Sequence, residues 1–235
     1  MPLWIALLAL TAYVAIVLSG VFILRLRMFV DAVCHGPEDA PAVALTFDDG
    51  PSPEHTPKVL ALLDKAQVKA TFFVIGKKAE TNPELVRQIV AKGHVIGSHS
   101  YLHSRAFSLL SRNQVRQDIT RSLDVLEKIT GERPTLFRPP IGHTNPRIAK
   151  VVEELGLTVV GWSVRTLDGL RSSSREAVAK RAKKGLQNGA IVLLHDASER
   201  DDYRPASVDV LPGILAAMKK QNLRGVTVTE FLESI

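Results

Sequence analysis

The sequence has a single cysteine, Cys34, so neither a disulfide framework nor a cluster of thiolate metal ligands can organise the chain. Aromatic residues are also few, at 6% of the total, and we find no internal repeat and no low-complexity tract. The 235 residues are 46% hydrophobic and 23% charged, which is typical of a globular protein with one sizeable domain. This composition excludes disordered and fibrous architectures.

The sequence also has only a small excess of positive over negative side chains. The chain has 30 Lys and Arg against 24 Asp and Glu, a formal net charge of +6, and no long basic run. We therefore expect no nucleic-acid partner. One basic helical stretch could face anionic lipid, although an ordinary solvated helix face is the simpler interpretation. Its basic residues are Arg175, Lys180, Arg181, Lys183 and Lys184.

Residues 1–24 contain no charged side chain. As a helix they would be about 36 Å long, enough to cross a hydrocarbon core of roughly 30 Å. A cleaved signal peptide normally has basic residues before a shorter apolar run, whereas here Arg25 and Arg27 follow the run. We therefore expect residues 1–30 to be an uncleaved single-pass anchor in a bacterial plasma membrane. Two arginines are a weak topological signal, so both orientations stay open.

The remaining sequence divides into a linker, residues 31–41, and one catalytic domain, residues 42–235. In the domain, short apolar runs alternate with helical patterns whose ends carry capping residues, Pro and Gly. The expected strands are 42–47, 70–75, 94–97, 135–138, 158–164, 190–195 and 225–228. Such alternation predicts an α/β fold with a parallel sheet, and the strand count favours a closed or nearly closed barrel. No glycine-rich fingerprint follows the first strand, which argues against a dinucleotide-binding fold.

Titratable side chains stand at the ends of most of these strands. In parallel α/β folds the carboxyl ends of the strands form the active site, so these groups should converge on one rim. They are Asp48 and Asp49, His99 and His103, Arg138, Asp168 and His195.

The pattern suggests a metal centre with three protein ligands. His99 and His103 are four residues apart, and on a helical turn both imidazoles would lie on one side. Together with Asp49 they make an N₂O ligand set that leaves a position open for water. An Asp-Gly-Pro turn or a chance His pair would explain each motif alone. Their combination predicts a divalent metal, with Zn²⁺ expected and Co²⁺, Ni²⁺ or Mn²⁺ as alternatives.

The neighbouring groups would complete a hydrolase. Asp48 could serve as general base for a metal-activated water, and His195 could protonate a leaving amine. Arg138 could hold Asp48 ionised, while Asp168 could favour the imidazolium form of His195. The residues therefore predict metal-assisted hydrolysis of an amide or ester.

At this point the chain resembles the polysaccharide deacetylases, carbohydrate esterase family 4, over about residues 40–233. The motifs that carry the resemblance are Thr46-Phe47-Asp48-Asp49-Gly50, His99-Ser100-x-x-His103, Arg138-Pro139-Pro140-x-Gly142 and Leu193-x-His195. The resemblance implies a distorted (β/α)₇ barrel. It also implies that Asp48 is the catalytic base and His195 the acid. Asp49, His99 and His103 would be the metal ligands, and Arg138 would tether the base.

The resemblance further implies an acetyl pocket with Leu193 in its wall, and substrate contacts from the segment around Pro140. The chain departs from the family pattern at three positions. Ile141 replaces a Tyr, but its backbone N–H can still stabilise an oxyanion. Gly169 replaces a Trp after Asp168, which opens one wall that Trp162 could fill, and Arg165 replaces an acid.

We therefore expect a hydrolase that removes N-acetyl groups from N-acetylhexosamine units. The substrate would be peptidoglycan, a chitin-like oligomer or a lipid-linked sugar. An O-acetyl carbohydrate esterase and a catalytically silent sugar-binding barrel are the alternatives. A phosphatase with an Asp nucleophile would have its two acids one residue apart, unlike Asp48 and Asp49. The sequence leaves the oligomeric state open.

Overall fold

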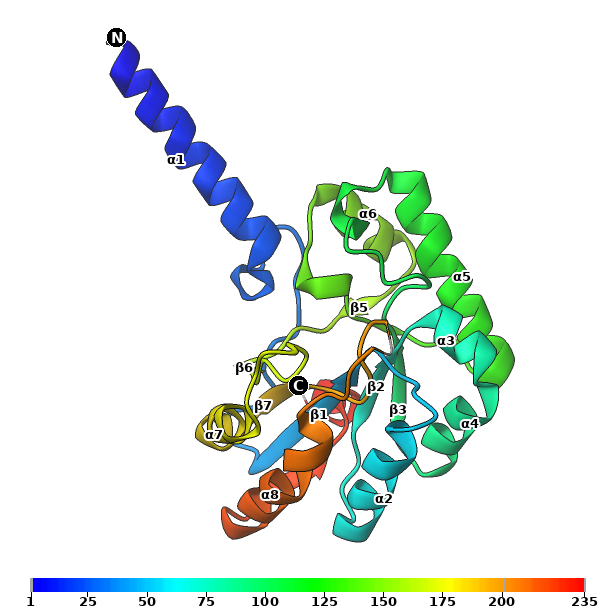
Figure 1. Cartoon of the computed structure of the whole chain (residues 1–235). Helices are drawn as coiled ribbons and strands as arrows, with labels where there is room; N and C mark the ends of the chain where they lie inside the picture. Colours follow the sequence, from blue (N-terminus) through cyan, green and yellow to red (C-terminus); the bar gives the residue numbers. More distant parts are fainter. Residues whose placement is uncertain (1, 201, 235) are drawn as a thin grey trace.

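The computed structural model describes residues 2–200 and 202–234, which form a curled parallel sheet surrounded by helices (Figure 1). The sheet of these residues runs in the order β5-β4-β3-β2-β1-β7-β6, and β8 pairs with the start of β1. All of these pairings are parallel. The strands are β1 (Ala42–Asp48), β2 (Thr71–Val74), β3 (Val95–Ser98), β4 (Leu136–Phe137), β5 (Thr158–Val159), β6 (Val164–Arg165), β7 (Ala190–His195) and β8 (Arg224–Val226).

The helices begin and end largely where capping signals stand. Ser111 forms a capping box with Gln114 at the start of the longest domain helix, and Gly131 ends that helix in a left-handed conformation. Asn145 caps the helix that starts at Pro146. The helices are α1 (Leu3–Phe22), α2 (Thr56–Ala66), α3 (Gly76–Thr81), α4 (Pro83–Ala91), α5 (Arg112–Thr130), α6 (Pro146–Glu154), α7 (Arg175–Gly185), α8 (Ser207–Lys220) and α9 (Val228–Glu233).

The central strand β1 is buried on both faces. Val43, Leu45 and Phe47 pack into the core beneath the surrounding helices, whereas Ala42 and Ala44 belong to a separate core inside the curled sheet. Burial on both faces explains why this strand is a continuous apolar run. The interior side of its carboxyl end is the exception, because two polar residues, Thr46 and Asp48, stand there. The fold class expected from the sequence, a distorted α/β barrel, is confirmed.

The strand expected over residues 158–164 is not one strand, and that prediction was wrong in this detail. Its first part, β5, pairs with β4, and its last part, β6, pairs with β7. Between them the carbonyls of Val160 and Gly161 accept hydrogen bonds from Nε and Nη2 of Arg138, at 3.1 and 2.8 Å. The Arg138 side chain, directly after β4, thus donates to two carbonyls that would bond to a neighbouring strand in a continuous sheet. This interruption is the distortion of the barrel.

The segment preceding β1 fills part of that interruption. Val33 N donates to Val159 O, and Gly161 N donates to Val33 O, both at 2.8 Å. Gly36 N donates to Gly189 O, next to β7, at the same distance. Because Ala32 and Cys34 are buried there, part of the expected linker packs as barrel wall. The boundaries between anchor, linker and catalytic domain remain a prediction.

Helix α1 extends away from the domain and is long and apolar enough to cross a membrane (Figure 1). A signal sequence at the same position would also meet these criteria. Its last turn contacts the loop after β4, where Thr144 N donates to Val21 O at 3.1 Å. The rings of Phe22 and His143 also meet edge to face, with centroids 4.8 Å apart. The helix therefore ends at the rim formed by the carboxyl ends of the strands.

Candidate metal and catalytic site

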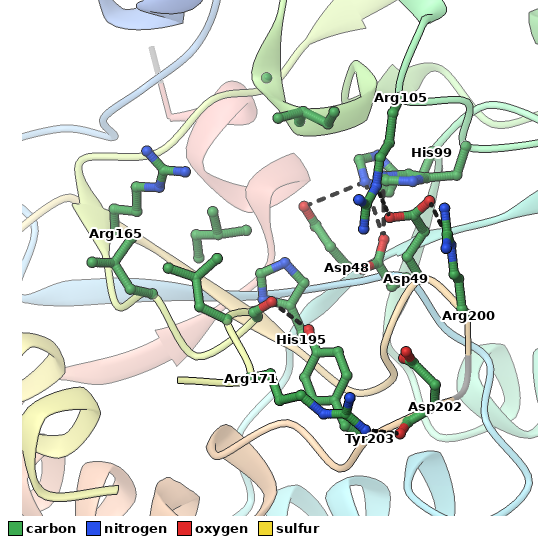
Figure 2. A pocket seen from close by; sticks show the side chains of 18 of the residues that line it. Asp48, Asp49, His99, Arg105, Arg165, Arg171, His195, Arg200, Asp202 and Tyr203 are labelled. Atoms are coloured by element: carbon green, nitrogen blue, oxygen red, sulfur yellow. Dashed lines mark hydrogen bonds and ion pairs between the residues drawn. The ribbon is translucent and has the colours of Figure 1, made fainter. Parts of the chain in front are cut away.

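The two carboxylates at the end of β1 point into one pocket at this rim (Figure 2). Asp48 is the last residue of the strand and is paired in register with His195 of β7. Asp49 follows in a left-handed conformation, with φ of 71°. Asp is among the residues that tolerate this region, and the turn brings Asp49 alongside its neighbour. A strand that continued would have sent the two side chains to opposite faces.

His99 and His103 lie close together, but not on a helical turn, so the expected local conformation was wrong. The segment after β3 is an irregular loop in which Ser100 and His103 have φ of 66° and 51°. Asp118 of α5 holds the loop, because its carboxylate accepts from the backbone N–H groups of Tyr101 and Leu102 at 2.8 and 3.1 Å. The ring centroids of the two histidines are 4.6 Å apart.

The geometry of Asp49, His99 and His103 fits a metal ion. Their ligand atoms all lie within 4.8 Å of one another, and all three residues are buried. Asp49 Oδ1 is 3.5 Å from Nε2 of His99 and 3.4 Å from Nε2 of His103. Two atoms about 2.1 Å from one ion at a tetrahedral angle would be separated by about 3.4 Å.

Two further observations support this fit. Asp49 Oδ1 is buried, and among the described residues it has no hydrogen-bond partner. A buried carboxylate oxygen left in that state is costly unless a cation satisfies it. Nδ1 of His99 is 2.7 Å from the carbonyl of Arg138, which orients the imidazole with Nε2 towards Asp49. Burial, followed by the nearby His103, lowers the pKa of His99 well below its usual value, favouring the neutral imidazole that metals bind.

Asp48 is held by a fully buried arginine. Arg138 Nη1 donates to Asp48 Oδ1 at 2.7 Å and to Thr46 Oγ1 at 2.8 Å. The guanidinium also lies 4.1 Å from the centroid of the Phe73 ring. Burial raises the pKa of Asp48, while the charges of Arg138 and His195 oppose that rise. The site therefore contains a carboxylate that is a stronger base than an exposed Asp, in a fixed orientation.

A second buried pair lies at the end of β7, the strand next to β1. Asp168 Oδ1 is 3.0 Å from Nδ1 of His195, and its Oδ2 accepts from the His195 backbone N–H at 2.7 Å. Burial would lower the pKa of His195, but Asp168, followed by Asp49 and Asp48, raises it to about 10. In turn, burial would raise the pKa of Asp168, but the imidazolium and the hydrogen bonds lower it. The pair therefore presents a protonated imidazole at neutral pH.

The pocket between these groups has a volume of about 540 Å³, within the range of small-ligand sites. Ile141, Trp162 and Leu193 line it as expected, whereas Pro140 is buried and is not among the described residues that line it. Ile141 has φ of 60°, which is uncommon for a β-branched residue and places strain at this wall. The surrounding structure must therefore hold the backbone of Ile141 in this orientation at the pocket.

Steric crowding by His195 explains why Gly169 stands where the family pattern has Trp. A β-carbon on Gly169 would lie 2.7 Å from Cε1 of His195, so any larger residue would displace the imidazole. The hydroxyl of Tyr203 donates to the carbonyl of Gly169, and its ring lies beside His195 (Figure 2). Tyr203 lines the pocket with Trp162, so the open wall is partly filled from the segment after β7.

Sequence reasoning missed several residues of the site. Tyr203, Arg105, Arg171 and Arg200 stand on irregular segments, where no periodicity marks them. Asp196 directly follows His195 at the end of β7 and could have been found by the strand-end argument. It is buried, it accepts from Thr56 Oγ1, and burial raises its pKa to about 7. A β-carbon on Gly50 would lie 2.4 Å from Asp196 Oδ2, so this carboxyl packs beneath the turn that carries Asp49.

Comparison with known proteins identifies the family. The family model for polysaccharide deacetylases matches residues 35–160. The chain is 39% identical over 197 residues to a peptidoglycan-N-acetylglucosamine deacetylase of Bacillus cereus, which covers 83% of this chain and 90% of the relative.

Two solved structures are similar over most of their length. One is a peptidoglycan N-acetylglucosamine deacetylase with a TM-score of 0.79 and 33% identity, covering 85% of this chain and 92% of the other. The second is a family 4 acetyl xylan esterase from Clostridium thermocellum in complex with cobalt. Its TM-score is 0.75 at 35% identity, covering 82% of this chain and 90% of the other. With its strand-end motifs gathered around one pocket, this chain belongs to the polysaccharide deacetylase family, carbohydrate esterase family 4.

Proposed function

We propose that this protein is a metal-dependent hydrolase that removes N-acetyl groups from N-acetylhexosamine units of a glycan. The observation that carries the proposal is that Asp48 and His195 line the same pocket as the Asp49–His99–His103 cluster. The relatives named peptidoglycan-N-acetylglucosamine deacetylases favour an amide substrate.

The candidate ligands Asp49, His99 and His103 would hold a divalent ion, for which Zn²⁺ is our first choice. When bound, such an ion polarises a substrate carbonyl and lowers the pKa of a water molecule. Asp48 takes the proton from the attacking water, and Arg138 keeps its carboxylate pointed at the pocket. The backbone N–H of Ile141 donates to the oxyanion that develops from the carbonyl. His195 then protonates the nitrogen that leaves, so that acetate and a free amine result.

A second candidate function is the hydrolysis of O-acetyl groups, favoured by the similarity to an acetyl xylan esterase structure. The same residues would serve it, because only the atom that His195 protonates differs. We also propose that α1 anchors the enzyme in a membrane as a single span. A reporter fused to the C-terminus, active on only one side of the membrane, would determine which side the domain faces.

The test is acetate release by the full chain in detergent from three substrates: N-acetylglucosamine oligomers, peptidoglycan strands and acetylated xylan. We expect release from the N-acetylated substrates, loss of activity on chelation and recovery when Zn²⁺, Co²⁺, Ni²⁺ or Mn²⁺ is added back. Preferential release from xylan would identify an esterase. If no substrate yields acetate with any of these metals, the proposal fails, and binding of the oligomers without hydrolysis would then identify a silent sugar-binding barrel.

A further inference from the structure

The mouth of the pocket carries more positive charge than an uncharged sugar requires. Beyond the catalytic cluster, the lining contains the side chains of Arg105, Arg165, Arg171 and Arg200 against those of Glu199 and Asp202, a balance of four positive charges to two negative. Figure 2 shows the arginines spaced around the carboxylates and His195. A cleft lined by one sign of charge attracts ligands of the opposite sign.

Arg165 differs from the other arginines of the mouth. Arg105 pairs with Glu199 at 2.9 Å, and Arg171 donates to the carbonyl of Asp202 at 3.0 Å. Arg165, at the end of β6, lines the pocket, and its side chain forms no hydrogen bond or ion pair with any described residue. Its planar guanidinium is therefore free to bind an external anion through two parallel hydrogen bonds.

The position of Arg165 relative to α1 points to the origin of that anion. Arg165 is near enough to His143 for its charge to add to burial in lowering the pKa of that imidazole. His143 in turn contacts Phe22, the last residue of α1. The unpaired cation thus lies on the side of the pocket that faces the candidate membrane span.

Apolar side chains on the same rim are consistent with a lipid nearby. Ile141 and Leu170 both line the pocket and are 40% and 49% exposed. A lipid-linked sugar offers an acyl or prenyl chain, a phosphate and an acetamido sugar in that order. In a 2-acetamido sugar 1-phosphate, the phosphate on C1 is adjacent to the acetamido group on C2. One pocket can therefore hold both groups.

We propose that the substrate is an N-acetylated sugar joined through a phosphate to a membrane lipid, with the phosphate bound by Arg165 and the lipid directed towards α1. This inference rests on the proposed deacetylase function and names the substrate class for it. Polymeric neutral glycans are then secondary substrates.

The test compares four probes on the full chain in lipid nanodiscs with Zn²⁺ supplied. They are the decyl phosphate ester of N-acetylglucosamine at C1, the uncharged decyl glycoside, N-acetylglucosamine 1-phosphate and the N-acetylglucosamine tetramer. We expect kcat/KM for acetate release from the phosphate ester to exceed that from the decyl glycoside by about tenfold or more, as one charge-assisted contact allows. Binding of the phosphate ester to chelated protein, measured by calorimetry, should show a similar preference.

Substitution of Arg165 tests whether this residue causes the preference for the phosphate ester. Arg165→Gln should reduce the ratio between phosphate ester and decyl glycoside to about one to two, in both kcat/KM and binding, and Arg165→Lys should restore part of it. Arg224→Gln removes an exposed arginine at the opposite end of the barrel and should leave the ratio unchanged.

The outcomes separate this inference from the proposed function. Equal kcat/KM for the phosphate ester and the decyl glycoside, with acetate released from both, would overturn the inference and leave the deacetylase function intact. A 1-phosphate as good as its decyl ester would overturn the lipid linkage. If no probe releases acetate, the proposed function fails, and a binding ratio that Arg165→Gln does not reduce would overturn the phosphate site independently.

Discussion

Two buried pairs of opposite charge border one pocket at the ends of the neighbouring strands β1 and β7, and they differ in which partner lines the pocket. In the Asp48–Arg138 pair the carboxylate borders the pocket and the arginine lies fully behind it. In the Asp168–His195 pair the imidazole borders the pocket and the carboxylate lies behind. The same interaction thus presents a carboxylate to the pocket in one pair and a protonated imidazole in the other. The role of each pair follows from its orientation rather than from its composition.

The two pairs also differ in how many hydrogen bonds connect them to the surrounding strands. Arg138 uses Nε, Nη1 and Nη2 to bond to β1 and to the interrupted segment between β5 and β6. His195 has a partly exposed side chain and depends mainly on Asp168. Substitutions in the first pair should therefore affect both stability and rate, and those in the second mainly rate and its pH dependence.

The largest expected effect is on catalysis, in both pairs alike. Asp48→Asn and His195→Ala should each lower kcat for acetate release by about 10²- to 10⁴-fold, because each removes one proton-transfer group. Glu153→Gln, an exposed carboxylate far from the pocket, is the matched control and should keep the wild-type rate. An Asp48→Asn enzyme at full speed would contradict the role of the base.

The next effect separates the pairs by stability. Arg138→Met should lower the free energy of unfolding by about 3–5 kcal/mol, because it leaves Asp48 buried without its cation. Chemical denaturation of Arg138→Met and His195→Ala measures the difference, and we expect the smaller loss in the second. Equal losses would mean that the two pairs contribute equally to the fold.

A third effect concerns pH. Asp168→Asn should move the alkaline limb of the kcat/KM profile to lower pH by at least about one unit, since the carboxylate that raises the pKa of His195 is gone. Because the pKa of His195 is higher in the folded chain, the pair stabilises the fold fully below about pH 6.5. This contribution is lost as the pH rises towards about 10, and it should be absent from Asp168→Asn. Unchanged pH profiles would show that Asp168 has only a packing role.

The smallest effects test one hydroxyl beside each pair. Thr46 Oγ1 accepts from Arg138, and Thr166 Oγ1 donates to Asp168 at 2.7 Å. Thr46→Val and Thr166→Val should each cost about 1 kcal/mol of unfolding free energy. Only Thr166→Val should also shift the alkaline limb, by a fraction of a unit to higher pH, because Asp168 loses a donor that competes with His195 for its negative charge. A shift of that limb in Thr46→Val instead would mean that both pairs control the same titration.

The grouping of Asp48, Asp49, His99, His103 and His195 at one pocket could be predicted because parallel strands place their carboxyl ends on one rim. The conformation of the loop between His99 and His103 could not, because Asp118 fixes it from a helix distant in sequence. The division of the strand over residues 158–164 likewise depends on Arg138, twenty residues earlier. Contacts of this kind leave no periodicity in the local sequence.

Arg138 makes the assembly of the barrel and the alignment of the base a single event. Its hydrogen bonds close the interrupted wall and aim Asp48 at the same time. An incompletely assembled chain would therefore have no aligned base and could not hydrolyse substrate prematurely. With metal and substrate in excess, acetate release should therefore scale with the fraction of molecules whose wall is closed.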